Sequence, residues 1–365
     1  MRKKVLYLIK AGEDFYDLIR SVMPDDRYEL LTLQDGSNGE RRQLLEQAEL
    51  VIVGGARMSE KDVDAAVNLR LVLHQGVGYH DTVATKSLME RQIRLAVTPQ
   101  GTSEGVAEHT IMMMLAVGRR LAFCDSELRK GNWHSNTFRS TARQLFGSTV
   151  GIIGLGRIGK QVAKRLIGFN VKTLYTDILE IEKDTEKQLQ VTRVRLDELL
   201  KKSDFVTLHL PLTDATHHLI DARALSIMKP GATLINCARG PVVSELALID
   251  ALKSGHLGGA GLDVFEVEPP ENPNPFAEFA NVILTPHHAP GTRDTMVIKF
   301  RELFANADRF FAGDRMENEI SLSLQGVETI VSIVLTKYEQ KSGITELNFE
   351  NRFEFRPRRK LGGIY

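Results

Sequence analysis

The feature that most constrains this chain is a glycine-rich turn that follows the apolar stretch 150–153. Its glycines, Gly154, Gly156 and Gly159, are spaced as G-x-G-x-x-G. In a strand–turn–helix unit the first glycine permits a tight turn, the second lets a pyrophosphate approach the backbone, and the third lets the helix pack on the strand. Unpaired amides and the helix dipole then favour the phosphate charge. The pattern therefore predicts a dinucleotide-binding turn.

The residues after the turn supply the context that the motif needs. Apolar residues four positions apart, Ile158, Val162 and Leu166, predict a helix, and Gly168 suits the left-handed position at its end. The next predicted strand ends at Asp177, where a carboxylate would accept hydrogen bonds from ribose hydroxyls and repel a 2′-phosphate. The sequence thus favours NAD over NADP. The alternative is an ordinary βαβ turn that binds no phosphate.

Composition excludes several classes of protein. At 365 residues the chain has room for two domains, and 42% hydrophobic with 26% charged residues is ordinary for a globular protein. The 47 basic residues balance the 47 acidic ones, so no nucleic-acid or membrane partner is expected. Two cysteines without a C-x-x-C pattern indicate neither a disulfide framework nor a metal site. With no predicted signal peptide or membrane span, we expect a cytoplasmic protein.

Strands alternate with helices through most of the chain, which predicts parallel sheets with helices on both faces. Residues 1–99 show this alternation without a nucleotide fingerprint, so they are expected to form a separate domain. Residues 102–122 predict one long helix capped by Thr102 or Ser103. Residues 124–146 are expected to be an irregular arm that holds the only tryptophan.

Four polar residues follow predicted strand ends in the second half of the chain: Arg239, Asp263, Glu268 and His287. Chemistry in open α/β sheets gathers beyond the carboxyl ends of the strands, so a shared crevice is expected. A guanidinium holds a carboxylate bidentately, a histidine exchanges protons near neutral pH, and a carboxylate orients the histidine and favours its charged form. These are the parts that hydride transfer between a nicotinamide and a 2-keto or 2-hydroxy acid requires.

Two of these assignments have a neighbour of the same type. Glu266 competes with Glu268, and His288 competes with His287. The position directly after Pro286 favours His287.

At this point the sequence resembles the D-isomer-specific 2-hydroxyacid dehydrogenase family. The resemblance covers roughly residues 1–320 and rests on motifs in order along the chain. These motifs are residues 150–159, 209–213, 236–241, 261–269 and 284–287. It implies two α/β domains, each a parallel sheet with helices on both faces, in which a Rossmann dinucleotide-binding domain is inserted in a flavodoxin-like substrate domain.

The resemblance also implies boundaries for these domains. Residues 1–99 and 288–320 would form the substrate-binding domain, and residues 100–287 the NAD-binding domain. Residues 321–365 form a tail to which we assign no role.

Site residues are carried over from the family by position. Arg239, Glu268 and His287 match the catalytic residues, and Val77 and Gly78 match a loop that assists Arg239 in holding the substrate carboxylate. The positions expected to bind the cofactor are Gly154, Gly156, Arg157, Ile158, Gly159, Asp177, His209, Pro211, Thr213, Cys237, Ala238 and Asp263. Among them Asp263 matches the acid that contacts the nicotinamide carboxamide. No metal is implied, and the family implies a homodimer formed through the arm.

The resemblance therefore predicts an NAD-dependent oxidoreductase that interconverts a 2-keto acid and a D-2-hydroxy acid. Glyoxylate, hydroxypyruvate and 3-phosphohydroxypyruvate share the carboxylate–carbonyl head that these residues would bind. One alternative is a formate dehydrogenase, but those enzymes have Gln where Glu268 stands. The other is a corepressor-like protein on the same scaffold that senses NADH.

Overall fold

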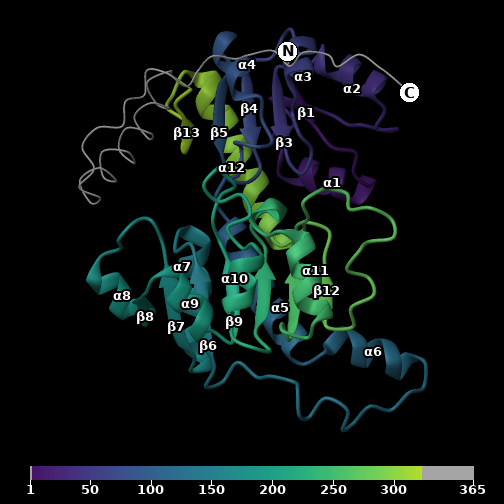
Figure 1. The fold of residues 1–365 in the computed structure, drawn as a ribbon. Helices are drawn as coiled ribbons and strands as arrows, with labels where there is room; N and C mark the ends of the chain where they lie inside the picture. The colour runs from purple at the N-terminus through teal and green to yellow at the C-terminus, as the bar shows by residue number, and fades with distance from the viewer. Residues whose placement is uncertain (1, 323–365) are drawn as a thin grey trace, which may run out of the picture. The chain divides into compact units, whose positions relative to one another are not determined.

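The computed structural model describes residues 2–322 (Figure 1). Most of the predicted tail, residues 323–365, lies outside the described residues. No helix among the described residues is long and apolar enough to cross a membrane.

The first sheet is built from the two ends of the described chain. Its strand order is β13-β5-β4-β3-β1-β2, parallel except for the antiparallel edge strand β13. The strands are β1 (Lys3–Tyr7), β2 (Tyr28–Leu31), β3 (Leu50–Val53), β4 (Leu71–His74), β5 (Arg94–Val97) and β13 (Glu319–Ile320). Because β3 and β4 are buried along their whole length, they read as continuous apolar runs rather than as alternating ones.

Helices cover both faces of the first sheet. They are α1 (Glu13–Val22), α2 (Asn38–Leu45), α3 (Glu60–Ala65), α4 (Thr85–Glu90) and α12 (Arg293–Ala312). Phe300 and Phe304 of α12 share one core with Tyr16 and Ile19 of α1. The last helix thus packs on the first sheet.

The second sheet has the order β12-β11-β10-β9-β6-β7-β8 and is parallel throughout. Its strands are β6 (Thr149–Ile153), β7 (Lys172–Thr176), β8 (Val191–Arg193), β9 (Phe205–Leu208), β10 (Thr233–Asn236), β11 (Gly259–Leu262) and β12 (Val282–Leu284). The strand order reverses beside β6, which is the kind of position where α/β sheets bind ligands. The glycine turn follows this strand.

Helices pack on both faces of the second sheet (Figure 1), and each face has its own apolar core. On one side pack α5 (Thr102–Gly118) and α7 (Arg157–Leu166), and on the other pack α9 (Leu196–Lys202), α10 (Ala222–Ile227) and α11 (Glu245–Lys253). The remaining helices are α6 (Leu121–Arg129), α8 (Lys183–Leu189) and the short 3₁₀ turns Ile167–Phe169 and Gly240–Val242. Both sheets with their helices form α/β domains, as predicted, whereas the exact domain boundaries remain a prediction.

The long helix predicted over 102–122 begins at the predicted residue, Thr102, but its predicted cap and its predicted end are wrong. It begins after Gly101, whose φ is 72°, without a side-chain cap from Thr102 or Ser103. It stops at Gly118, because Arg120 adopts a left-handed conformation with φ 55°.

Two neighbouring predictions were also wrong. The start of the expected irregular arm is helical, since α6 runs to Arg129. At the end of α7 the left-handed residue is Asn170, with φ 51°, rather than Gly168. A 3₁₀ turn extends the helix end and moves the reversal to Asn170, where an amide side chain tolerates this conformation.

Candidate active site

The three glycines of the turn have different surroundings: protein atoms pack against Gly154 and Gly159, whereas Gly156 faces open space. Gly154 has φ 91°, and a methyl group there would overlap the carbonyl of His209. A methyl group at Gly159 would overlap the carbonyl of Gly154, so helix α7 packs directly on the turn. A methyl group at Gly156 would meet nothing within 4 Å. The backbone of Gly156 therefore borders open space, as the approach of a pyrophosphate requires.

Asp177, directly after β7, reaches back to this turn. Its Oδ2 accepts a hydrogen bond from the amide of Leu155 at 2.6 Å, and its Oδ1 accepts one from the amide of Leu179 at 2.8 Å. Ile178 and Leu179 beside it expose apolar side chains. A carboxylate with free lone pairs next to an apolar surface suits the adenosine end of a dinucleotide, and it disfavours a 2′-phosphate.

His209 lies on the other side of the turn. Its amide donates to the carbonyl of Ile153 at 2.7 Å, and its ring Nε2 lies 3.0 Å from the hydroxyl of Thr207. Burial lowers the pKa of His209 to about 3, so the ring stays neutral. Its Nδ1 is buried and finds no hydrogen-bond partner among the described residues. Pro211 and Thr213 follow on the exposed part of the same loop.

Cys237 and Ala238 follow β10 and are both buried. Burial, together with the charge of Asp263, raises the pKa of the Cys237 thiol to about 12. The thiol is therefore uncharged and unreactive at neutral pH, which agrees with its interpretation as a packed residue. The open space at Gly156 and the orphaned Nδ1 of His209 show that the residues present fit NAD.

Glu268 and His287 are in direct contact. The Nδ1 of His287 lies 2.7 Å from Oε2 of Glu268, while Oε1 of Glu268 accepts a hydrogen bond from the amide of Phe265 at 3.0 Å. Burial alone would raise the pKa of Glu268, but the hydrogen bond and charge of His287, the Phe265 amide and the charge of Arg239 together lower it. Glu268 is thus a fixed carboxylate that orients the imidazole and leaves its Nε2 available.

The competing neighbours have other partners. Glu266 lies 3.1 Å from Nε2 of His218 and accepts a hydrogen bond from the amide of Glu245. The ring of His288 packs edge-on against His109, with 5.3 Å between centroids. In this arrangement Glu268 and His287 form the pair, rather than Glu266 and His288.

Asp263 is fully buried and supports the loop that carries His287. Its Oδ1 accepts from the hydroxyl of Thr285 at 2.6 Å and from the amide of His288 at 3.0 Å, and its Oδ2 accepts from the amide of Ala289 at 2.9 Å. Side-chain atoms of His109, Asp263 and His288 lie within 4.8 Å of one another, a spacing at which such groups can hold a metal. Since the carboxylate is already bonded to three donors, we assign this cluster to the support of the loop.

Arg239 points at the predicted substrate loop. Its Nη2 lies 3.3 Å from the carbonyl of Gly78 and its Nη1 lies 2.9 Å from the carbonyl of Ala238. Val77 in the same loop is 40% exposed. A methyl group at Gly78 would overlap the guanidinium, so only glycine lets Arg239 approach this closely. The structure thus brings the predicted cation next to the predicted loop.

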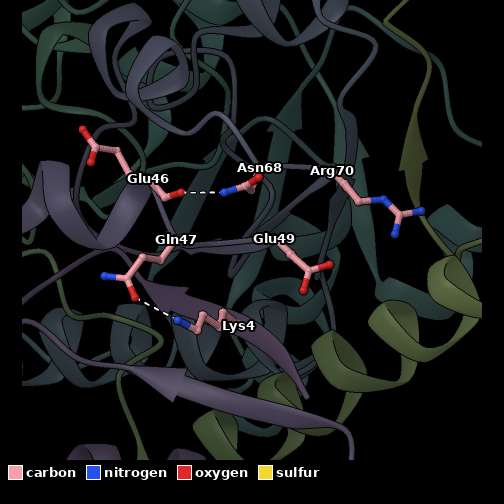
Figure 2. Close-up of a pocket in the computed structure, with 6 residues that line it drawn as sticks. All are labelled: Lys4, Glu46, Gln47, Glu49, Asn68 and Arg70. Atoms are coloured by element: carbon pink, nitrogen blue, oxygen red, sulfur yellow. Dashed lines mark hydrogen bonds between the residues drawn. The ribbon is translucent and has the colours of Figure 1, made fainter. Parts of the chain in front are cut away.

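A second surface feature lies far from these residues in the fold. Figure 2 shows an open depression at the amino ends of β1, β3 and β4, whereas the glycine loop follows the carboxyl end of β4. It is lined by Lys4, Glu46, Gln47, Glu49, Asn68 and Arg70. Lys4 donates to Gln47 at 2.9 Å, and Asn68 donates to the carbonyl of Glu46 at 2.7 Å. The carboxylates of Glu46 and Glu49 pair with Arg42 and Lys3 outside the depression, which contains none of the predicted site residues.

Three residues that contact the predicted site residues had not been predicted from the sequence: Asp81, His109 and Thr285. Asp81 pairs with Arg239, and His109 lies 3.1 Å from the Thr285 hydroxyl that bonds to Asp263. Asp81 stands three residues after Gly78, and Thr285 lies inside the motif 284–287, so the position of each was a signal in the sequence. His109 is one of several polar residues in α5, and no local pattern distinguished it.

Comparisons with known proteins show which family the chain is similar to. A family model described as "D-isomer specific 2-hydroxyacid dehydrogenase, NAD binding domain" matches residues 111–289. A glyoxylate reductase of Thermofilum pendens is 45% identical over 233 residues, which are 63% of this chain and 68% of that protein. A hydroxypyruvate reductase of Thermotoga maritima is 36% identical over 247 residues, 67% of this chain and 78% of that protein.

A solved structure is similar over nearly the whole described chain. The apo form of D-mandelate dehydrogenase from Rhodotorula graminis superposes with a TM-score of 0.74 at 29% identity, covering 88% of this chain and 98% of that one.

Proposed function

Because this chain belongs to the D-isomer-specific 2-hydroxyacid dehydrogenase family and uses NAD, we propose that it interconverts a 2-keto acid and a D-2-hydroxy acid through Arg239, Glu268 and His287. The observation that carries this proposal is the 2.7 Å contact between His287 and Glu268. A histidine backed by a fixed carboxylate is the acid–base device that this reaction needs. When bound, NADH supplies the hydride for C2 of the keto acid.

Arg239 binds the carboxylate of the substrate in this proposal. A guanidinium is a cation whose N–H groups match the two oxygens of a carboxylate. The loop at Val77 and Gly78 lies against it and adds backbone amides. Together they fix the substrate so that its carbonyl oxygen faces His287.

His287 moves the proton. Its Nδ1 is held by Glu268, so its Nε2 protonates the carbonyl oxygen during reduction and accepts the hydroxyl proton during oxidation. Reduction therefore needs the imidazolium and oxidation the neutral imidazole. Formate oxidation exchanges no proton with a base, so a carboxylate at Glu268 favours a hydroxy-acid enzyme over a formate dehydrogenase.

In this proposal the two sheets belong to domains with different roles. Residues 1–99 and 288–320 would bind the substrate, and residues 100–287 would bind NAD. The support for this division is that the glycine loop follows β4 of the first sheet, whereas the fingerprint turn follows β6 of the second.

A small 2-keto acid is the proposed substrate class, since two similar proteins are named glyoxylate reductase and hydroxypyruvate reductase. The test is a panel of keto acids assayed with NADH and with NADPH. We expect turnover of glyoxylate or hydroxypyruvate with a preference for NADH, and Arg239→Ala should raise the keto-acid KM while NADH still binds. NADH binding without turnover of any keto acid would favour the NADH-sensing corepressor-like alternative.

We also propose that the chain forms a homodimer through α5, α6 and the segment that follows. The support is a group of large apolar side chains left exposed there. They are Met112, Leu115, Leu121, Leu128, Trp133 and Phe146. Light scattering of the wild type and of Trp133→Ala tests this, since a monomeric wild type would contradict it.

A further inference from the structure

Asp81 is bonded to the arginine on which substrate binding depends. Its Oδ2 accepts a hydrogen bond from Nε of Arg239 at 2.8 Å, although 158 residues separate the two in sequence. Asp81 lies in the loop after β4 of the first sheet, whereas Arg239 lies after β10 of the second. One ion pair therefore joins the substrate loop to the arginine across the two halves of the site.

The hydrogen bonds of Arg239 leave a defined part of its guanidinium free. A guanidinium carries five N–H donors, of which Asp81, Gly78 and Ala238 engage one each, through Nε, Nη2 and Nη1. One N–H on each terminal nitrogen then remains. A bidentate contact with a carboxylate uses two N–H groups, which is the number that remains. Since Asp81 contacts a single nitrogen, it holds the arginine without occupying this pair.

The loop that carries Asp81 is itself fixed from within the first sheet. The amide of Gly76 donates to Nδ1 of His74 at 3.0 Å, so Nε2 of that ring carries the proton and donates to Thr82 Oγ1 at 2.9 Å. The Thr82 hydroxyl in turn donates to the carbonyl of Gly78 at 3.0 Å. Burial lowers the pKa of His74 to about 4, so this neutral arrangement persists at physiological pH. Asp81 is thus presented by a preformed loop.

We propose that Asp81 is a positioning residue for substrate recognition, which aims the guanidinium of Arg239 so that its free N–H pair meets the carboxylate of the keto acid. This inference rests on the proposed role of Arg239. Without the Asp81 contact, the long arginine side chain would sample several rotamers, and part of the binding energy would be lost in ordering it.

The test compares Asp81→Ala and Asp81→Asn with the wild type in steady-state reduction of glyoxylate, or of whichever keto acid the panel identifies. We expect Asp81→Ala to raise the keto-acid KM by about 10-fold or more and to lower kcat, with the Kd for NADH unchanged. Asp81→Asn keeps an oxygen that can accept from Nε, so it should recover part of the loss. Asp64→Ala, which removes an exposed acid on α3, is the matched control and should behave as the wild type.

A double-mutant cycle separates positioning from general support of the fold. In an Arg239→Lys background, Asp81→Ala should raise the keto-acid KM much less than it does in the wild type, because the arginine that Asp81 positions is absent. An unchanged or lower KM in Asp81→Ala would overturn the inference, the lower value showing that Asp81 competes with the substrate. Additive effects in the cycle would overturn it as well. A wild type that reduces no keto acid would instead remove the proposed function, and this inference with it.

Discussion

The backbone of His287 is held by Asp263 in a conformation that residues other than glycine seldom adopt. His287 has φ 50°, and its amide donates to the carbonyl of Asp263 at 2.7 Å. The carboxylate of Asp263 fixes the next two amides of the loop as well. A left-handed backbone at a non-glycine residue costs roughly 1 kcal/mol or more and persists only where its surroundings enforce it. Asp263 therefore determines where the imidazole points.

The substitution Asp263→Asn should break part of the hydrogen bonding that holds the loop of His287. The new side chain has an amide nitrogen in place of one carboxylate oxygen, so it cannot accept from both neighbouring N–H groups and the loop must shift. We expect kcat to fall by roughly 10- to 100-fold. The free energy of unfolding should fall by roughly 1–3 kcal/mol. Steady-state kinetics and urea unfolding measure the two effects.

Asp204→Asn is the matched control, because Asp204 is also buried and bonded but accepts from Thr149, Arg143 and Lys229 at the amino end of β9. It should lose stability and keep kcat. Similar losses of kcat in both variants would show that the effect of Asp263 is only on the fold.

Glu268→Gln tests the acid–base pair through its pH profile. The glutamine can still accept from Nδ1 of His287, but it no longer stabilises the imidazolium. The pH above which keto-acid reduction declines should therefore drop, and hydroxy-acid oxidation should persist to lower pH. Glu266→Gln, which alters the contact with His218 instead, should leave both profiles unchanged. Identical profiles for Glu268→Gln and the wild type would contradict the pairing.

Gly156→Ala tests the open side of the fingerprint turn. The added methyl group meets no protein atom, so folding should be unaffected, but it would occupy the space into which the pyrophosphate comes. We expect the Kd for NADH to rise by about 10-fold without a change in melting temperature. Gly159→Ala is the contrast, since its methyl group overlaps a backbone carbonyl and should destabilise the protein. Unaltered NADH binding by Gly156→Ala would show that the cofactor does not approach there.

Local patterns were enough to predict much of the fold. The buried strands of a parallel sheet are short apolar runs bounded by turn residues, and the glycine turn was correctly placed between β6 and α7. The break of the long helix was not predictable in this way. A methyl group at Gly118 would overlap the carbonyl of Arg143, so the helix ends where a distant segment packs against it. Sequence patterns record local preferences and do not show such contacts.

Some contacts of the candidate site were likewise predictable from local patterns, and others were not. Glu268 and His287 lie 19 residues apart and follow neighbouring strands, so strand-end reasoning brought them together. The ion pair between Asp81 and Arg239 depends on how two sheets meet, and no pattern within either sheet contains that information. The burial of Lys299 in α12 was not predictable either, because the periodicity of the helix does not distinguish this residue from its neighbours.

Lys299 is a charged residue in the interior of the first sheet's core. It is 2% exposed, and among residues 2–322 its ammonium has neither a hydrogen bond nor an ion pair. Burial lowers its pKa from the ordinary 10.5 to about 8. An ammonium that loses most of its hydration on burial and gains no partner destabilises the folded state.

Lys299→Met should therefore stabilise the protein near neutral pH, by about 1–3 kcal/mol. Between pH 8 and 10.5 the unfolded wild type still binds the Lys299 proton whereas the folded protein does not, so wild-type stability gains up to roughly 3 kcal/mol across this range. The advantage of the variant over the wild type should shrink accordingly as pH rises. Urea unfolding at pH 7, 8.5 and 10 measures it, with the exposed Lys61→Met as a control that shows no such trend. If Lys299→Met is less stable than the wild type at pH 7, the Lys299 ammonium stabilises the folded protein and this prediction is wrong.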